Sequence, residues 1–282
     1  MSSMDQYAVF GSPIEHSKSP RIHTLFAEQT QQTLQYSAEL VPAEQFEPAV
    51  QTFFAKGGRG LNCTVPLKEL AWAHADKRTE RAELAKAVNT LVWQEDGSLL
   101  GDNTDGIGLV VDMQHNHGIA LAQKRILILG AGGASRGIIL PMLEQSPVAI
   151  SIANRTVAKA LTLADEFCHK GDVTGCAYAA LAGQQFDVII NATSASLSDD
   201  LPPLVEGLLA EQGYCYDLAY ANKPTAFVRW GHQQQARKSL DGLGMLVEQA
   251  AEAFYLWRGV RPVTTGVIQL LQAERQLVGQ ST

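Results

Sequence analysis

One segment in the middle of the chain constrains the fold more than any other. The apolar run Arg125-Ile-Leu-Ile-Leu129 leads directly into the glycine-rich turn Gly130-Ala-Gly-Gly-Ala-Ser135, and residues 136–144 continue with a helical pattern. A strand, a glycine turn and a helix in this order are typical of a dinucleotide-binding fold, in which the pyrophosphate lies at the helix N-terminus. The third glycine of G-x-G-x-x-G is replaced by Ser135, so a glycine-rich turn without a ligand is the alternative.

The end of the next expected strand indicates which dinucleotide would bind. Residues 148–153 predict this strand, and Asn154-Arg155-Thr156 follow it, with Lys159 one helical turn later. NAD-binding folds place an acidic residue here for the ribose 2′-hydroxyl, whereas a guanidinium can pair with a 2′-phosphate. The pattern therefore favours NADP. The alternative, that Arg155 and Lys159 are ordinary solvated residues, is weakened because cations at a helix N-terminus oppose the helix dipole.

The first third of the chain has a second α/β pattern. Strand-like runs at 6–10, 34–40 and 59–64 alternate with amphipathic helical runs at 21–32 and 44–56. This βαβαβ order predicts a mainly parallel sheet. Two further strands, 88–93 and 98–101, flank the turn Glu95-Asp96-Gly97.

These patterns predict an α/β protein of two domains, with the active site in the cleft between them. A cluster of turn residues at 102–106 suggests a boundary, and strand-like runs at 186–190 and 214–218 extend the second sheet. The helical runs 243–257 and 265–278 could pack on either domain. We expect a substrate-binding domain of residues 1–105, completed by C-terminal helices within 243–282, and a Rossmann-like NADP-binding domain of residues 106–242.

Composition excludes several classes of protein. With 46% apolar and 18% charged residues, the 282-residue chain is expected to fold, and its net charge of −7 argues against a nucleic-acid partner. Apolar runs are interrupted before the roughly 18 residues that a membrane span needs, and the N-terminus lacks a signal-like pattern. The four cysteines lack C-x-x-C spacing and the histidines lack metal spacing, so we expect buried free thiols, no metal and a cytoplasmic location.

A dinucleotide site implies hydride transfer, so the other domain should hold a substrate and a group that moves a hydroxyl proton. Lys68 follows the strand-like run 59–64, at the edge where α/β sheets place ligands, and can act as a general acid or base. Asp105 could bind the same hydroxyl or hold the lysine. Taken singly, Lys68 could equally be a surface lysine and Asp105 a helix N-cap.

Several motifs together resemble one family. They are Val9–Pro20 (VFGSPIEHSKSP), Asn62–Lys68 (NCTVPLK), Ala87–Thr90 (AVNT), Gly101–Gly106 (GDNTDG), Gly130–Arg136 (GAGGASR), Asn154–Thr156 (NRT) and Asp241–Met245 (DGLGM). In this order they resemble the shikimate dehydrogenases, over essentially the whole chain.

The resemblance implies the reversible reduction of 3-dehydroshikimate to shikimate with NADPH. It implies Lys68 as the catalytic general acid or base and Asp105 as its carboxylate partner. The positions that match substrate-binding residues are Ser17 and Ser19 for the carboxylate, Thr64, Asn89 and Gln249 for the ring hydroxyls, and Tyr220 lining the cleft.

The resemblance also implies the cofactor-binding residues. These are Gly130, Ala131, Gly132, Gly133 and Ala134 for the pyrophosphate, Asn154, Arg155, Thr156 and Lys159 for the 2′-phosphate, and the more peripheral Glu80, Leu218, Gly242 and Met245. Relatives often carry arginine at Lys159, so NADP selectivity could be softer here. The alternatives are a quinate/shikimate dehydrogenase with broader substrate and cofactor use and a non-catalytic NADPH sensor. A monomer or homodimer with a small-molecule substrate is expected.

Overall fold

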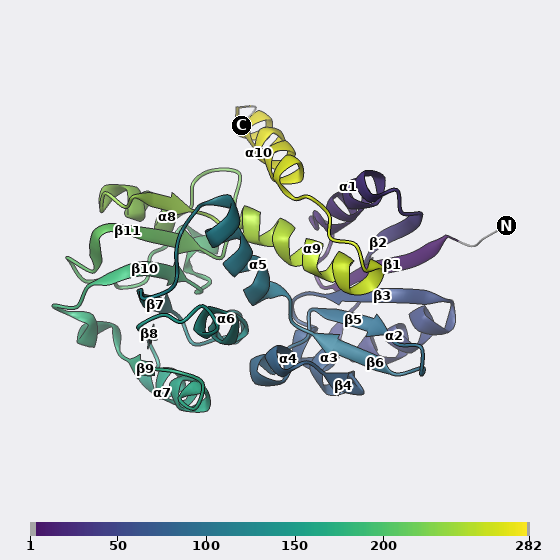
Figure 1. The fold of residues 1–282 in the computed structure, drawn as a ribbon, viewed down its shortest axis with the longest axis horizontal. Coiled ribbons are helices and arrows are strands. Elements are labelled where there is room, and N and C mark those ends of the chain that lie inside the picture. Colours follow the sequence, from purple (N-terminus) through teal and green to yellow (C-terminus); the bar gives the residue numbers. More distant parts are fainter. Residues whose placement is uncertain (1–3, 281–282) are drawn as a thin grey trace. The chain divides into compact units, whose positions relative to one another are not determined.

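The computed structural model describes residues 4–280, which form two compact units (Figure 1). Unit 1 comprises the residues up to Gly108 together with Val247–Ile268. Unit 2 comprises Leu109–Leu246 together with the residues from Gln269 onward. The outermost residues of the expected substrate-binding domain, 1–3 and 281–282, lie outside the described part of the chain.

Unit 1 contains a six-stranded mixed sheet with the order β2-β1-β3-β5-β6-β4. The strand pairs β1–β2, β1–β3 and β4–β6 are parallel, whereas β5 runs antiparallel to β3 and β6. The strands are β1 (Asp5–Gly11), β2 (Leu34–Leu40), β3 (Gly58–Cys63), β4 (Lys77–Arg78), β5 (Thr90–Trp93) and β6 (Leu99–Asp102). The helices are α1 (Ser19–Thr30), α2 (Phe46–Ala55), α3 (Lys68–His74), α4 (Glu80–Ala85) and the larger part of α9 (Leu243–Arg258).

Alternation along β1 builds the core on both faces of this sheet. Ala8 and Phe10 pack in one cluster with side chains of α2, α3 and α4. Tyr7 and Val9 point the other way, into a cluster that includes Trp257 of α9. Because successive strand residues face opposite sides, one apolar strand holds helices on both faces.

Unit 2 contains a second six-stranded sheet, in which every pair of neighbouring strands is parallel. The order is β12-β11-β10-β7-β8-β9. Its strands are β7 (Arg125–Leu129), β8 (Ala149–Ala153), β9 (Val173–Cys176), β10 (Phe186–Asn191), β11 (Leu209–Asp217) and β12 (Lys238–Leu240), and its helices include α6 (Gly133–Leu143), α7 (Val157–Phe167) and α8 (Ala226–Gln233).

Strand order reverses at β7, which lies between β8 and β10. In open α/β sheets, ligands bind at the carboxyl ends of the strands where this reversal occurs. The glycine turn Gly130–Ala134 follows β7 directly, so it lies at this reversal point. The α/β architecture with a Rossmann-like second sheet confirms the expected fold class.

Three helices belong partly to each unit, and one of them is α9, whose residues 243–246 lie in unit 2. Helix α5 (Asp105–Val111) continues into a π-helical turn, Asp112–Asn116, and α10 (Thr265–Gln280) begins in unit 1. Within residues 4–280, no helix is long and apolar enough to cross a membrane. The cysteines are free thiols, but only Cys63 and Cys215 of the four are buried as expected, whereas Cys176 is half-buried and Cys168 is exposed.

Candidate active site

Lys68 and Asp105 form an ion pair in unit 1. Lys68 is the first residue of α3 and Asp105 the first residue of α5, and the distance from Lys68 Nζ to Asp105 Oδ2 is 2.5 Å. Their side chains are 29% and 18% exposed, so both are shielded but can be reached by a ligand. The other oxygen, Asp105 Oδ1, accepts a hydrogen bond from Asn89 Nδ2 at 2.8 Å. The Asp105 carboxylate therefore binds side chains of the site rather than capping its own helix.

Asn89 is the centre of a buried hydrogen-bond network around this pair. Its Nδ2 also donates to Thr104 Oγ1 at 2.9 Å and to Gln249 Oε1 at 3.3 Å. Its Oδ1 accepts from the Thr104 backbone N–H at 2.9 Å. Asn89 is 3% exposed, and a buried amide with this many partners has one stable orientation.

The network continues from Asn89 to Ser19. Asn62 Nδ2 donates to the Asn89 carbonyl and to Thr90 Oγ1, both at 3.0 Å. Asn62 Oδ1 accepts from the Tyr36 hydroxyl at 2.6 Å, and the Tyr36 hydroxyl in turn hydrogen-bonds to Ser19. Burial raises the pKa of Tyr36 well above its usual value, so this hydroxyl keeps its proton.

Sequence reasoning missed Tyr36, Asn62, Thr90 and Thr104 as members of the site. Asn62, Thr90 and Thr104 stand inside the quoted motifs, and a polar residue at the end of an otherwise apolar strand was the available signal. Tyr36 carried no such signal, because a tyrosine in a strand is ordinarily a packing residue.

A buried carboxylate fixes the turn that carries Asp105. Asp102 is 1% exposed and binds Arg81 through two contacts, Nε–Oδ1 at 2.7 Å and Nη2–Oδ2 at 2.5 Å. Thr79 Oγ1 donates to the same carboxylate at 2.6 Å. Asn103 Oδ1 accepts from the Asp105 backbone N–H at 3.1 Å. The backbone of Asp105 is thus held before any ligand binds.

Ser17 and Thr64 lie in two loops at one edge of the unit 1 sheet. Ser17 follows β1 and Thr64 follows β3, and these strands are parallel neighbours. A backbone hydrogen bond from Ser12 N–H to the Val65 carbonyl, at 3.1 Å, joins the loops. Ser17 Oγ accepts from the Ser19 N–H at 3.3 Å, so both serines lie at the start of α1.

Two predicted site residues belong to a different unit from the rest of their group. Tyr220 follows β11 in unit 2, whereas the other predicted substrate residues are in unit 1. Glu80, the exposed first residue of α4, is in unit 1, whereas the other predicted cofactor residues are in unit 2.

The glycine turn of unit 2 has the geometry of a phosphate site. Gly130 has φ +104°, and a Cβ there would lie 3.1 Å from the Ala192 carbonyl oxygen, so the turn needs glycine. A Cβ on Gly132 or Gly133 would meet no described atom within 4 Å, which leaves room for a ligand. Among the described residues no side chain caps α6, so the N–H groups of its first turn can bind an anion.

Ser135 explains why the third glycine is dispensable. Its side chain is fully buried, and its Oγ donates to the Gly130 carbonyl at 2.8 Å. The buried hydroxyl therefore joins the start of α6 to the first residue of the turn. The turn fits a dinucleotide pyrophosphate.

Two exposed cations follow β8, beside this turn in the sheet. Thr156 is the N-cap of α7, and Arg155 and Lys159 on either side of it are exposed. Within residues 4–280 neither cation is in an ion pair. Asn154 Nδ2 donates to the Thr156 carbonyl at 2.9 Å and so shapes the loop. This loop fits a 2′-phosphate.

The structure brings together three of the residues predicted to contact the cofactor peripherally. The Gly242 N–H donates to the Ala219 carbonyl at 3.1 Å, and a Cβ on Gly242 would overlap the Leu218 carbonyl oxygen. Met245, three residues later, donates its backbone N–H to the Tyr216 hydroxyl at 3.3 Å. Leu218, Gly242 and Met245 therefore lie around one tight contact between two loops.

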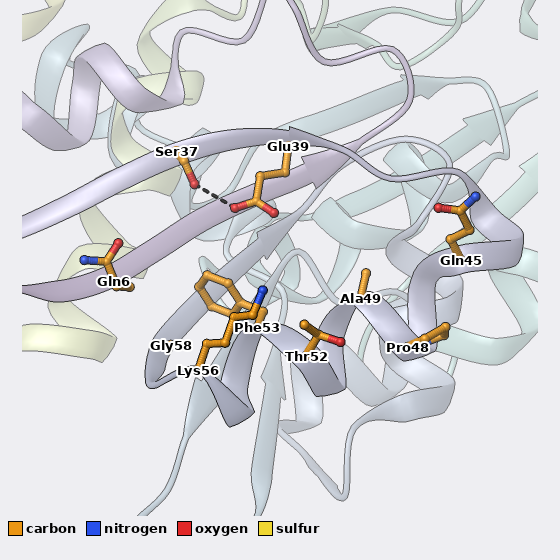
Figure 2. Close-up of a pocket in the computed structure, with 10 residues that line it drawn as sticks. All are labelled: Gln6, Ser37, Glu39, Gln45, Pro48, Ala49, Thr52, Phe53, Lys56 and Gly58. Carbon is orange, nitrogen blue, oxygen red and sulfur yellow. Dashed lines mark hydrogen bonds between the residues drawn. The ribbon is translucent and has the colours of Figure 1, made fainter.

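A cavity of about 600 Å³ lies elsewhere in unit 1, between α2 and the β1–β2 edge of the sheet (Figure 2). Its described lining includes Lys56, Glu39 and Phe53 but none of the predicted site residues. Among residues 4–280, no group of three or more His, Cys, Asp or Glu side chains could hold a metal ion.

Three family models match the chain in order. They are the shikimate dehydrogenase substrate binding domain at residues 9–91, shikimate / quinate 5-dehydrogenase at 112–200, and the shikimate 5'-dehydrogenase C-terminal domain at 242–272. The matched segments span both units.

Full-length relatives agree with these matches. A shikimate dehydrogenase (NADP(+)) of Methylococcus capsulatus is 63% identical over 276 residues, covering 98% of this chain and 99% of the relative. An Ael1 enzyme of Pseudomonas putida has a crystal structure with a TM-score of 0.89 at 50% identity, covering 95% of this chain and 98% of that one. A shikimate 5-dehydrogenase of Thermus thermophilus, solved in complex with NADP(H) and shikimate, has a TM-score of 0.84 at 34% identity, covering 94% and 98%. By sequence over nearly its whole length and by fold, the chain belongs to the shikimate dehydrogenase family.

Proposed function

We propose that the chain is an NADP-dependent oxidoreductase that interconverts 3-dehydroshikimate and shikimate. The observation that carries the proposal is the Lys68–Asp105 pair, joined through Asn89 to Gln249 in one buried network. A partly shielded ammonium held by a carboxylate, beside fixed amide groups, suits proton transfer to a hydroxylated substrate. Membership of the family supports the same reaction.

Lys68 moves the proton in this reaction. The glycine turn Gly130–Ala134 and Arg155 would hold NADPH, which would supply the hydride for reduction of the substrate carbonyl carbon; in the reverse direction NADP⁺ would accept it. In reduction, Lys68 Nζ gives a proton to the carbonyl oxygen as it becomes a hydroxyl. In oxidation, Lys68 takes that proton back. Asp105 orients the ammonium and stabilises its charge through the 2.5 Å contact.

The remaining unit 1 residues would bind the substrate. Ser17 and Ser19, at the start of α1, would hold the carboxylate. Thr64, Asn89 and Gln249 would bind the ring hydroxyls, and Tyr220 would line the site. The bonds from Tyr36 to Asn62 and from Asn62 to Asn89 support this assignment, because they fix two of these groups in advance.

The unit 2 residues would bind NADP. Gly130, Ala131, Gly132, Gly133 and Ala134 would hold the pyrophosphate, and Asn154, Arg155, Thr156 and Lys159 the 2′-phosphate. Leu218, Gly242 and Met245 would contact the cofactor further along, with Glu80 at its periphery. In this proposal the substrate domain is residues 1–105 with helices of 243–282, and the NADP domain is residues 106–242. We further propose that the enzyme is cytoplasmic and that it is a monomer or a homodimer.

The decisive experiment is a matrix of initial rates measured by absorbance at 340 nm. Purified protein is given shikimate or quinate, each with NADP⁺ or NAD⁺. Fast turnover confined to shikimate with NADP⁺ is expected. Comparable rates with quinate or NAD⁺ would instead identify a quinate/shikimate dehydrogenase. Tight NADPH binding without turnover of either substrate would identify a non-catalytic sensor.

A further inference from the structure

A fully buried carboxylate in unit 2 is outside the predicted site. Asp112 begins the π-helical turn Asp112–Asn116 and has no exposed surface. Its Oδ2 accepts from the Tyr216 hydroxyl at 2.7 Å, and its Oδ1 accepts from Asn116 Nδ2 at 2.9 Å. His117 Nε2 lies 3.6 Å from Oδ2. A buried carboxylate is costly without such partners, so this cluster is a built feature of the unit.

The Tyr216 hydroxyl links Asp112 to a second segment of the chain by hydrogen bonds. It is fully buried, donates its single proton to Asp112, and accepts from the Met245 backbone N–H at 3.3 Å. Burial and the nearby carboxylate raise the pKa of Tyr216 well above its usual value, so the hydroxyl keeps its proton. Because the hydroxyl donates its hydrogen bond to Asp112, its lone pairs are left to accept from the Met245 N–H.

Met245 lies in the first turn of α9, where backbone N–H groups lack partners within the helix. Tyr216 supplies one acceptor there. Asp241 Oδ1 supplies another, to the Leu243 N–H at 3.2 Å, and Asp241 is itself ion-paired with Arg275. A Cβ on Gly244 would overlap the Asp112 carboxylate, so glycine allows this close approach. Side chains of unit 2 thus hold the Asp241–Met245 segment at both ends.

We propose that Asp112 is a positioning residue for NADP, acting through Tyr216 on the Gly242–Met245 turn. The inference rests on the proposed function, which places the cofactor at Leu218, Gly242 and Met245. Asp112 does not itself touch the cofactor in this proposal. Asp112 fixes the conformation of the Gly242–Met245 turn in the protein without cofactor, so the binding of NADP does not have to order this turn.

The test removes one oxygen atom from the relay. Tyr216→Phe deletes the hydroxyl, and Tyr214→Phe makes the same change two residues earlier on β11 as the matched control. In the variant without cofactor, amide hydrogen exchange at Met245 should accelerate, because its acceptor is gone. The Kd for NADPH, measured by fluorescence titration, should rise about ten-fold from the lost hydrogen bond and the loosened turn. The KM for shikimate should stay within about two-fold of the parent, because the turn carries no predicted substrate residue.

Several outcomes would overturn the inference. An unchanged NADPH Kd in Tyr216→Phe, whether or not the Met245 amide exchanges faster, means that the relay does not position the cofactor. An equal rise in Tyr214→Phe means that the effect is general loosening of the sheet. If Tyr216→Phe does not fold, Gly244→Ala tests the same relay by displacing Asp112, with the same expected rise. A failure of the proposed function can be told apart from a failure of this inference. If the parent protein binds NADPH but does not oxidise shikimate, the NADPH titration of the variants still tests the inference.

Discussion

Lys68 is the residue on which the proposed chemistry depends most directly. We expect Lys68→Ala to lower kcat for shikimate oxidation by about 10³-fold, because general acid–base catalysis contributes roughly 10²–10⁴. KM for shikimate should change little, since the lost interaction matters mainly in the transition state. Lys77→Ala is the matched control: Lys77 also pairs with an aspartate, Asp96, at 2.7 Å in the same unit, but the pair is exposed. Steady-state kinetics on both variants decide, and full kcat in Lys68→Ala would contradict the mechanism.

The burial of His23 leads to a prediction about how the stability of the folded protein depends on pH. It is 1% exposed, stacks on Tyr36 with ring centroids 4.2 Å apart, and its Nε2 has no hydrogen-bond partner among the described residues. Burial lowers the pKa of His23 to about 3 from an ordinary 6.5. A histidine with a lowered folded-state pKa stabilises the protein fully above pH 6.5, and that stability is lost as pH falls toward the folded-state pKa.

The corresponding experiment compares the parent with His23→Phe, which keeps an aromatic ring against Tyr36 but cannot titrate. Between pH 7 and pH 5 the free energy of unfolding of the parent should fall by about 2 kcal/mol more than that of the variant. Urea unfolding at several pH values measures this difference. Parallel pH profiles for the two proteins would show that His23 is not held neutral by burial.

At the scale of strands and helices, the register of three strands brings together residues of the proposed substrate site. Asn62 of β3 lies opposite Thr90 of β5, and Thr90 lies opposite Asp102 of β6. Because β5 runs antiparallel to both β3 and β6, the start of β5 meets the ends of β3 and β6 at one edge of the sheet. Sequence spacing could not pair Lys68 with Asp105, since register across this mixed sheet has no local signal.

Helices and strands could be predicted from the sequence where their hydrophobic pattern extends over many residues. The first three strands and two helices of unit 1 fall within a few residues of the predicted ranges, because hydrophobic periodicity repeats over several turns or residues. The helices α3 and α4 and the two-residue strand β4 are too short to show a period. The expected strand at 88–93 begins only at Thr90, although the Asn89 backbone still hydrogen-bonds to Cys63 and Asp102 of the neighbouring strands.

The loop between β8 and α7 should set cofactor choice. Arg155→Ala is expected to raise the KM for NADP⁺ about 10–100-fold, because a charge-assisted hydrogen bond is worth about 1.5–3 kcal/mol. The KM for NAD⁺, which lacks the 2′-phosphate, should change little, and Lys159→Ala should have a smaller effect in the same direction. Lys170→Ala, an exposed lysine beyond the other end of α7, is the control. Equal losses for both cofactors would mean that Arg155 does not read the 2′-phosphate.

For the molecule as a whole, the proposed ligands divide between two hydrophobic cores. The predicted substrate residues other than Tyr220 belong to unit 1, and the predicted cofactor residues other than Glu80 belong to unit 2. Periodicity predicts the C-terminal helices but not the unit on which each packs. The structure assigns Val247–Ile268 to unit 1 and the residues from Gln269 onward to unit 2. Such an assignment depends on long-range packing, which a single helical pattern does not encode.

Because the proposed binding residues of the two ligands belong to different units, we expect each ligand to stabilise mainly the unit that binds it. A ligand at 100 times its Kd stabilises the state it binds by about 2.7 kcal/mol. NADP⁺ alone should therefore slow amide exchange most in segments 130–136 and 154–159, and shikimate alone in segments 62–68, 87–90 and 101–106. Hydrogen exchange read by mass spectrometry measures both, with NAD⁺ at the same concentration as a weaker-binding control for the cofactor. Protection by shikimate confined to unit 2 would contradict the placement of the substrate, because the residues proposed to hold its carboxylate and ring hydroxyls are all in unit 1.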